Sequence, residues 1–209
     1  MRTDRDTPLL TGRNLLLIRG DRALFSDLEF DLGRGEMLQI EGANGSGKTS
    51  LLRVIAGLTP PQEGIVRWRD RDVSRKRQAL HDDMVWAGHR PGFKGDLTLA
   101  ENLRFEAGLR RHGVRPLNTT VKRLGLASLM GLPFRVLSAG QQRRATLARL
   151  LLTDAALWLL DEPLTNLDVV GQTLVAELLD AHLAGGGLAV VASHRGLDLS
   201  AAVNRLRLS

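Results

Sequence analysis

The clearest chemical pattern in the chain is a glycine-rich segment that ends in a lysine and a threonine. It comprises Gly42, Ala43, Asn44, Gly45, Ser46, Gly47, Lys48 and Thr49, and Ser50 follows directly. This order fits the G-x-x-x-x-G-K-[ST] pattern, in which backbone N–H groups surround phosphate groups. We therefore expect these nine residues to bind a nucleotide. Lys48 should reach the β- and γ-phosphates, where it serves catalysis, and Thr49 should ligate Mg²⁺.

Two adjacent acidic residues form the second pattern. Asp161 and Glu162 directly follow the apolar run 157–160. A run that is apolar throughout is typical of a strand inside a parallel sheet, and open α/β folds bind ligands at the carboxyl edge of that sheet. We expect Asp161 to hold Mg²⁺ opposite Thr49. Glu162 should orient or deprotonate the water that attacks the γ-phosphate.

Strands and helices alternate along the chain in a way that would position these residues. Short apolar or alternating runs predict strands at 15–18, 25–32, 37–41, 65–68, 84–87, 157–160 and 188–193. Composition, with capping-box signals at Thr98 and Ser138, predicts helices at 48–56, 98–111, 138–152 and 169–183. This alternation favours a doubly wound α/β fold with a P-loop NTPase core.

Two parts of the chain depart from that alternation. The runs 15–18 and 25–32 suggest an antiparallel β edge, whereas about 91–152 contains no convincing strand. We interpret 1–209 as a single domain. Its core lies at about 1–90 and 153–209, and a helical subdomain lies at about 91–152.

Composition narrows the class of protein further. The chain has 209 residues and a net charge of +6, with the hydrophobic and charged fractions of an ordinary globular domain. The longest apolar run, 155–160, is six residues, and the charged start 1–6 has no apolar stretch, so we expect neither a transmembrane helix nor a secretory signal. Cysteine is absent, which excludes disulfides, a thiol nucleophile and a Cys-built zinc site. The basic balance indicates an anionic partner without specifying its class.

A third motif indicates a family. The segment 137–144 reads Leu-Ser-Ala-Gly-Gln-Gln-Arg-Arg, and in its place before Asp161 it resembles the signature motif of ABC-type ATPases. The segment 164–168 resembles the D-loop of the same family, and His194 resembles its switch histidine. The resemblance implies ATP and Mg²⁺ as ligands. It also implies a γ-phosphate contact for His194, which joins Lys48 and Glu162 as a catalytic residue.

The same resemblance implies a homodimer. In ABC-type ATPases two nucleotide-binding domains meet head to tail, so Ser138 and Gly140 of one copy would contact the γ-phosphate held by the other copy. Gln141 and Asp168 belong to the same expected nucleotide-binding set. A helix start suits this task because it offers N–H donors to an anion.

Shorter phrases resemble one group within the family, the haem exporter ATPases of cytochrome c maturation. These phrases are 25–26, 39–42, 88–89, 97–98, 101–103 and 137–144. The resemblance implies an ATPase at the cytoplasmic face of the bacterial inner membrane, where it is peripheral and drives separate integral membrane permease subunits. The helical stretch 91–152 is where the family docks its membrane subunit.

Two other functions remain open. One is the ATPase of another small ABC exporter, which the motifs barely separate from the first. The other is a non-transport ABC ATPase acting on nucleic acid, a class that carries a long coiled coil or two tandem ATPase domains, and this chain has neither. Because Asp70 and Asp72 interrupt the basic run 67–77, we expect no nucleic acid partner.

The adenine contact departs from the family pattern. ABC-type ATPases usually stack the adenine on an aromatic residue, often tyrosine, but here the stretch reads Ile18-Arg19-Gly20 and the chain has no tyrosine. One interpretation is that the guanidinium plane of Arg19 covers the adenine. The alternative is that Arg19 is solvated and the base is held loosely.

A second departure follows the strand 84–87, where the family expects a glutamine. By the haem exporter phrasing that position is Arg90, and by the spacing of other ABC proteins it is His89. An arginine has donors only and cannot ligate a cation. Either water completes the Mg²⁺ shell, or Arg90 contacts the γ-phosphate directly.

Overall fold

The order of the elements follows the alternation of apolar and glycine-rich segments in the sequence. The computed structural model describes residues 8–109, 115–194, 196–197 and 199–208. Its strands are β1 (Leu10–Arg19), β2 (Arg22–Leu32), β3 (Met37–Glu41), β4 (Glu63–Trp68), β5 (Arg71–Asp72), β6 (Met84–Ala87), β7 (Leu157–Asp161), β8 (Leu188–Ala192) and β9 (Val203–Arg207). Its helices are α1 (Lys48–Ile55), α2 (Arg77–Asp83), α3 (Leu99–Gly108), α4 (Leu117–Arg123), α5 (Ala139–Leu151) and α6 (Val169–Ala184).

A parallel sheet lies at the centre of the molecule. Its strand order is β6-β7-β8-β3-β9, and every neighbouring pair is parallel. Both β7 and β8 are buried along their whole length, as expected for strands covered on both faces. Because all the strands point the same way, Glu41, Ala87, Asp161 and Ala192 end at one edge, and the last two are register partners.

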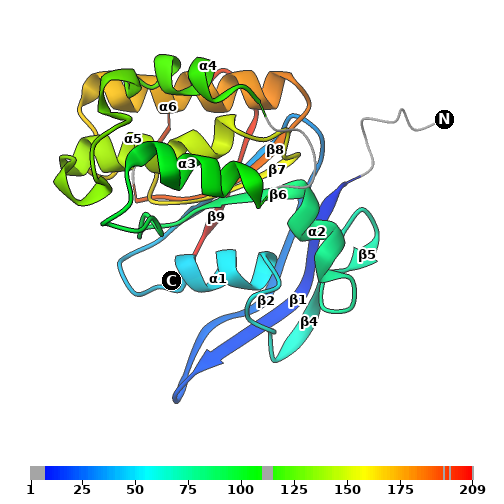
Figure 1. Ribbon diagram of the computed structural model, residues 1–209. Coiled ribbons are helices and arrows are strands. Elements are labelled where there is room, and N and C mark those ends of the chain that lie inside the picture. Colours follow the sequence, from blue (N-terminus) through cyan, green and yellow to red (C-terminus); the bar gives the residue numbers. More distant parts are fainter. Residues whose placement is uncertain (1–7, 110–114, 195, 198, 209) are drawn as a thin grey trace.

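A second, antiparallel sheet has the strand order β2-β1-β4-β5. Helix α1 lies between this sheet and the parallel one (Figure 1). One continuous core joins them, with Trp68 from the antiparallel sheet, Ile55 from α1 and Leu159 from the parallel sheet. The helix that begins at Lys48 is therefore held between two sheets.

The opposite face of the parallel sheet is covered by α3, α4, α5 and α6 (Figure 1). Their core includes Leu103, Leu147 and Leu179, together with Trp158 from β7. Capping boxes begin α3 at Thr98 and α5 at Ser138, where each side chain accepts a hydrogen bond from the backbone three residues on. These boxes fix the starts of both helices, and the second fixes the segment 137–144.

The α/β fold, its antiparallel part and the capping boxes are confirmed. The structure differs in several elements: β1 begins at Leu10 instead of residue 15, α2, β5 and β9 are new, and α4 is a further helix within the predicted helical stretch. Sequence reasoning missed α2 because its residues are mostly charged or polar, and β9 because its side chains are half-buried or exposed. The predicted helix end near Arg111 lies outside the described residues, as do 1–7 and Ser209 of the predicted domain.

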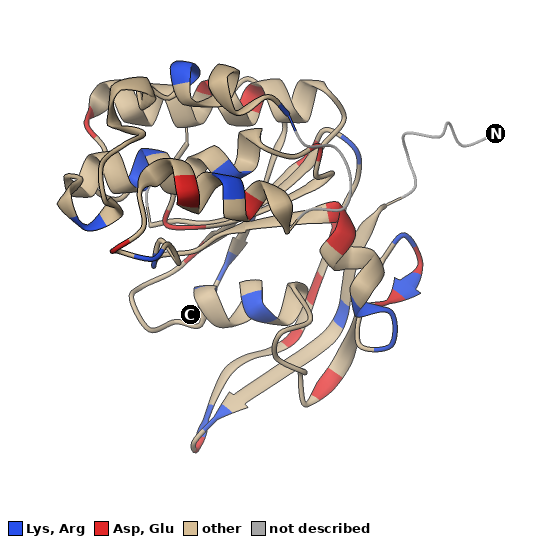
Figure 2. Cartoon of the chain, viewed as in Figure 1, with Lys and Arg blue, Asp and Glu red and all other residues tan. Residues whose placement is uncertain are grey.

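Acidic and basic residues are mixed over most elements (Figure 2). Around β4 and β5, Arg67 donates to the carbonyl of Asp70 at 3.2 Å, and Arg75 lies 3.5 Å from the Asp72 carboxylate. The Arg75–Asp72 pair therefore offsets part of the positive charge of the run 67–77, whereas the Arg67 bond is to a neutral carbonyl. Within the described ranges, none of the helices combines the length and the hydrophobicity needed to cross a bilayer.

Candidate nucleotide site

The glycine-rich segment forms a tight loop between β3 and α1. Gly42, Gly45 and Gly47 have φ values of 152°, 84° and 103°, in the region that side chains disfavour. A Cβ at Gly42 would lie 2.5 Å from Ser46 Oγ and 2.6 Å from the carbonyl of Leu208, so only glycine fits there. Ser46 Oγ is buried and has no hydrogen-bond partner among the described residues. The glycines are thus required by the close packing of the loop against itself and the end of β9.

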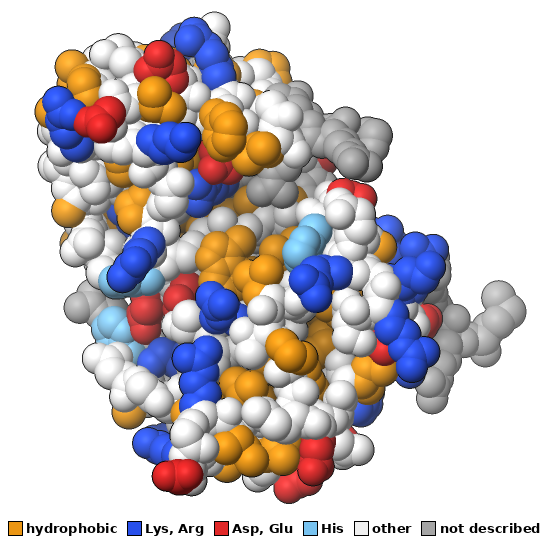
Figure 3. Space-filling model, turned by 60° about the horizontal axis from the view of Figure 1, so that its bottom comes forward, with side chains coloured by type: hydrophobic (Ala, Val, Ile, Leu, Met, Phe, Trp, Pro, Cys, Tyr) orange, Lys and Arg blue, Asp and Glu red, His pale blue; other side chains and the backbone are white. Residues whose placement is uncertain are grey.

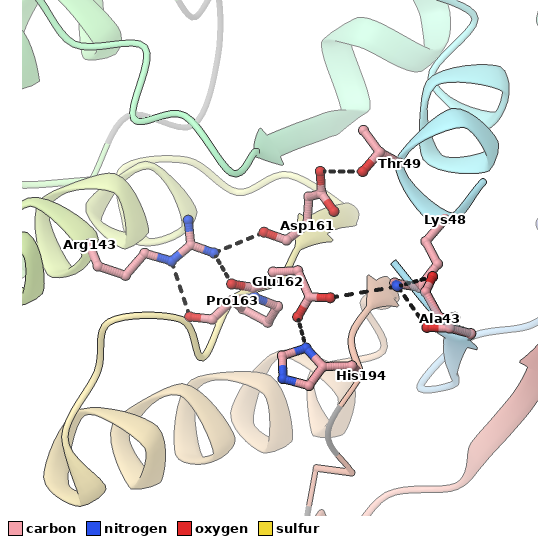
Figure 4. Close-up of polar contacts among 9 residues, drawn as sticks. Ala43, Lys48, Thr49, Arg143, Asp161, Glu162, Pro163 and His194 are labelled. Atoms are coloured by element: carbon pink, nitrogen blue, oxygen red, sulfur yellow. Dashed lines mark hydrogen bonds and ion pairs between the residues drawn. The ribbon is translucent and has the colours of Figure 1, made fainter. Parts of the chain in front are cut away.

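Lys48, the first residue of α1, lies folded over this loop. Its Nζ donates to the carbonyls of Gly42 at 2.8 Å and Ala43 at 3.1 Å, and it lies 3.9 Å from Glu162 Oε1 (Figure 4). The side chain is only 7% exposed. A buried ammonium with three donors, held inside the loop, is placed to exchange carbonyl oxygens for phosphate oxygens.

Thr49 and Asp161 meet across the site. The Thr49 hydroxyl donates to Asp161 Oδ2 at 2.9 Å (Figure 4). Burial raises the pKa of Asp161, an effect that the Thr49 hydrogen bond and the charges of His89 and Arg143 partly offset. A hydroxyl and a carboxylate are oxygen ligands of the kind Mg²⁺ prefers. Among the described residues, no group of three or more His, Cys, Asp or Glu side chains could hold a metal by itself. Thr49 and Asp161 therefore fit a metal that takes its other ligands from phosphate and water.

Glu162 lies at the centre of the polar network. Its Oε2 is 2.9 Å from His194 Nδ1, and its backbone N–H donates to the carbonyl of Ala192 at 2.8 Å. Its φ is +49°, a left-handed conformation that costs a non-glycine residue about 1–3 kcal/mol. The side chain therefore turns toward Lys48 and His194 instead of continuing the direction of Asp161 (Figure 4).

A cavity of about 420 Å³ collects these groups. It is lined by Arg19, Leu24, Asn44, Gly45, Gly47, Lys48, Thr49, Ser50, His89, Asp161 and Glu162. Of the two candidates after β6, the lining thus includes His89 and not Arg90. Arg19 lies at the cavity, and the described lining has no phenylalanine, tyrosine or tryptophan.

The signature residues lie elsewhere. Ser138, Gly140 and Gln141 begin α5 at an exposed or half-exposed surface and do not line the cavity of their own chain. A Cβ at Gly140 would lie 3.2 Å from the carbonyl of Asn166, so this helix start packs closely on the segment 164–168. The predicted nucleotide-binding residues therefore lie in two places, one at the cavity and one at the start of α5.

Asp168 belongs to the second place. Its Oδ1 caps α6 by accepting from the N–H of Gly171 at 2.8 Å, and it pairs with Arg144 at 3.1 Å. The hydrogen bond from Gly171 is the main reason that the pKa of Asp168 lies below its usual value. Asp168 thus links the signature helix to the start of α6.

Sequence reasoning missed one residue of the network, Arg143. Its guanidinium donates to backbone carbonyls of Asp161, Glu162 and Pro163 (Figure 4). Helical periodicity could have found it, because Arg143 lies four residues before Leu147 and seven before Leu150, on the buried face of α5.

Fold and site together define a P-loop NTPase. The carboxyl edge of a parallel sheet carries a glycine-rich loop of the P-loop pattern, a buried lysine, a hydroxyl–carboxylate pair and a second carboxylate beside a histidine.

Comparisons with known proteins agree. The family model described as "ABC transporter" matches residues 25–165. The "Cytochrome c biogenesis ATP-binding export protein CcmA" of Methylococcus capsulatus is 49% identical over 98% of this chain and 99% of its own length. The proteins of the same name from Nitrosococcus oceani and Yersinia pestis are 43% and 44% identical, over 94% and 95% of this chain and 91% of each relative.

Solved structures share the fold. An "ATP binding subunit of ABC transporter" has a TM-score of 0.81 at 23% identity and covers 89% of this chain and 79% of its own. A dimeric ATP-binding cassette bound to ADP and phosphate has a TM-score of 0.78 at 22% identity, with 89% and 88% covered. The chain belongs to the ABC transporter family of ATP-binding proteins, and within it to the cytochrome c biogenesis ATP-binding export proteins. It is an ATP-hydrolysing subunit of an ABC transporter.

Proposed function

We propose that this chain is the ATPase of the haem exporter complex of cytochrome c maturation, and that it works at the cytoplasmic face of the bacterial inner membrane. The observation that carries the proposal is full-length similarity, 49% over 98% of the chain, to a protein named as an ATP-binding export protein of cytochrome c biogenesis. The alternative, another small ABC exporter, has no such support among the relatives described above.

In the proposed mechanism Glu162 is the general base. Its carboxylate lines the nucleotide cavity and is oriented from one side by His194 and from the other by Lys48. Water that attacks the γ-phosphate gives a proton to Glu162, and the bond to the ADP oxygen breaks. General-base groups of this kind contribute about 10²–10⁴ in rate. Lys48 brings a positive charge to the phosphate oxygens, and His194 offers a ring nitrogen for a hydrogen bond.

We propose that Thr49 and Asp161 hold the Mg²⁺ that accompanies ATP. The metal neutralises phosphate charge when bound. Asp161 is 3% exposed and burial raises its pKa, so a nearby cation would favour its ionised form. Ala43, Asn44, Gly45, Ser46, Gly47 and Ser50 supply backbone and hydroxyl groups for the phosphates.

The nucleotide base lies against Arg19 in this proposal. Arg19 and Leu24 line the same cavity as the P-loop, and the cation–π pairs of the described residues do not include Arg19. His89 completes the metal side of the site, because it lies at the cavity and its charge acts on Asp161. Arg90, the next residue, is exposed, so we propose that it contacts nucleotide only after the dimer closes.

The complete site takes two copies of the chain. Ser138, Gly140 and Gln141 are accessible, lie at a helix start and are absent from their own chain's cavity, so they are available to a nucleotide bound by a second copy. A structural neighbour with the same fold is described as dimeric. We therefore propose a head-to-tail homodimer in which Asp168 lies near the contact.

In this proposal the single domain consists of a core at about 1–90 and 153–209 and a helical subdomain at about 91–152. The membrane partner docks on the helical subdomain. Large apolar side chains that are at least two-fifths exposed occur there at Phe105, Leu109, Leu132 and Val136. These exposed apolar side chains fit a protein partner. Hydrophobic side chains also gather near the centre of the face that Figure 3 shows, with lysine or arginine side chains around them.

The substitution Glu162→Gln tests the mechanism. We expect ATP hydrolysis to fall by about 10²–10⁴ because Gln cannot accept the proton. ATP binding should persist, and the variant should form an ATP-dependent dimer in size-exclusion chromatography. The matched control is Glu177→Gln, which changes an exposed glutamate on α6 and should leave turnover unchanged. Unimpaired turnover of Glu162→Gln would remove Glu162 from the role of base.

Affinity purification from native membranes tests the biological role. Recovery of cytochrome c maturation membrane proteins with the tagged chain is the expected result. Recovery of a different permease in their place would overturn the haem exporter proposal, while leaving the ATPase mechanism intact.

A further inference from the structure

Arg143 is a buried cation in the signature helix that faces the catalytic edge of its own chain. Its side chain on α5 is 6% exposed. Its Nη1 donates to the carbonyl of Gly88 at 2.8 Å and its Nε to that of Pro163 at 3.1 Å. Its Nη2 donates to the carbonyls of Asp161 at 3.0 Å and Glu162 at 2.6 Å. One guanidinium thus binds four backbone acceptors from two strand ends.

These acceptors belong to segments that carry the proposed chemistry. Gly88 follows β6 and precedes His89, which lines the nucleotide cavity. Asp161 ends β7, and Glu162 carries the proposed base. Pro163 leads into the segment 164–168, on which Gly140 packs. Arg143 therefore connects the signature helix, the base and the loop after β6 within one chain.

The chemistry of the bonds requires an arginine. A planar guanidinium offers five donors in a fixed fork, whereas a lysine ammonium is a compact charge with three donors. Burial lowers the pKa of Arg143, and the charges of Asp161 and Glu162 act in the opposite direction. Removing the guanidinium would take a donor from four backbone carbonyls, although that of Glu162 would keep its bond from the N–H of Thr165, and the strained backbone at Glu162 would lose a support.

We propose that Arg143 is a positioning residue, which fixes Glu162 and His89 relative to the signature helix. Arg143 is not among the residues that line the nucleotide cavity. In the head-to-tail dimer, each chain gives its P-loop and Glu162 to one ATP and its signature to the other, so Arg143 joins the two sites through a single chain. This inference rests on the proposed function.

Kinetics of Arg143→Gln and Arg143→Lys, in the full chain, test this role. We expect kcat to fall about 10- to 100-fold in Arg143→Gln, because a small displacement of a catalytic group has effects of that size. The fall in Arg143→Lys should be smaller, since the charge and some of the donors remain. KM for ATP should stay within about threefold of wild type, because no phosphate or base contact is removed. Both variants should retain a cooperative melt.

Arg149→Gln is the matched control. Arg149 lies on the same helix and is largely buried, but it pairs with Glu106 at 2.6 Å and covers the ring of Phe93 at 4.5 Å. Its loss should lower stability and leave kcat of the folded protein unchanged. A lower kcat with an unchanged KM in the Arg143 variants, together with an unchanged kcat in Arg149→Gln, supports a positioning role for Arg143.

Three results would overturn the proposal. The first is a cooperatively folded Arg143→Gln with wild-type kcat. The second is a loss of activity in proportion to the folded fraction, as in the control. The third is failure of both Arg143 variants to fold, which would make the residue purely structural. A wild-type protein without ATPase activity would instead contradict the proposed function itself.

Discussion

The two ends of the parallel sheet differ in the kind of group that they bury. At the carboxyl end, Asp161 is 3% exposed, and the side chains of Lys48 and Glu162 are 7% and 18% exposed, so charges lie close together with little water. At the amino end, the ring of His182 stacks on Trp158, with centroids 3.9 Å apart and planes at 9°. There the buried groups are mostly neutral side chains that pack against one another.

The carboxyl end of the sheet thus carries the proposed chemistry, whereas the amino end contributes to the stability of the fold. At the carboxyl end burial raises the pKa of Asp161, and Glu162 adopts a left-handed backbone, so the folded state holds unfavourable features where a ligand binds. At the amino end His182 Nε2 lies 3.0 Å from the carbonyl of Leu188, and burial lowers the pKa of His182, which keeps it neutral. Variants at the two ends should therefore fail in different ways.

The largest effect on stability is expected from His182→Ala. It removes the stack on Trp158 and the bond to Leu188. The ring packs so closely on Gly187 that a Cβ there would lie 2.2 Å from it, so loss of the ring leaves a cavity. We expect the free energy of unfolding to fall by about 2–4 kcal/mol. ATPase activity per folded molecule should be unchanged.

Urea unfolding and steady-state ATPase assays measure both quantities. The control is His81→Ala, because His81 Nε2 makes a similar bond to the carbonyl of Ala56 at 2.9 Å without a ring stack. The control should lose less stability than His182→Ala. If His182→Ala kept its stability and lost kcat, the assignment of the two ends would be reversed.

A smaller effect concerns pH. The pKa of His182 is lowered from 6.5 in the folded chain, mainly by burial, so the unfolded state takes up the proton first as pH falls. Its contribution to stability is present above pH 6.5 and is lost as pH falls from there toward the lower folded pKa. Wild type should therefore lose stability faster than His182→Ala, by at most about 1.4 kcal/mol per pH unit.

Urea titrations between about pH 7.5 and pH 5.5 compare the two proteins. Subtracting one curve from the other cancels the histidines that both share. Parallel curves would mean that His182 takes up its proton equally in the folded and unfolded states, contrary to its burial.

Much of the fold was predictable because its signals are local. The buried runs of β7 and β8 and the capping boxes at Thr98 and Ser138 depend on neighbouring residues, and the structure confirms them. By contrast, β9 is added to the sheet beside β3, more than 160 residues away in sequence, and its own residues carry little apolar pattern. Such an edge strand is defined by its partner.

The site also contains residues that local sequence motifs predict and residues that only distant contacts define. Gly42, Lys48, Thr49 and Asp161 belong to contiguous motifs, so the sequence predicts their grouping and the structure brings them together. The four bonds of Arg143 are different, because they join residues from 18 to 55 positions apart. The choice between His89 and Arg90 also depends on how the chain leaves β6, which only the folded structure shows.

The most direct test of this division is Asp161→Asn, assayed for thermal stability and ATPase activity at neutral pH without and with MgATP. Burial raises the pKa of Asp161, so its ionised form costs stability at neutral pH, whereas Asn can still accept the Thr49 hydrogen bond. We predict that ATPase activity is lost while the nucleotide-free protein melts at an equal or higher temperature than wild type. A variant that melts several degrees lower, or that hydrolyses ATP normally, would contradict the claim that this end of the sheet is built for chemistry at the expense of stability.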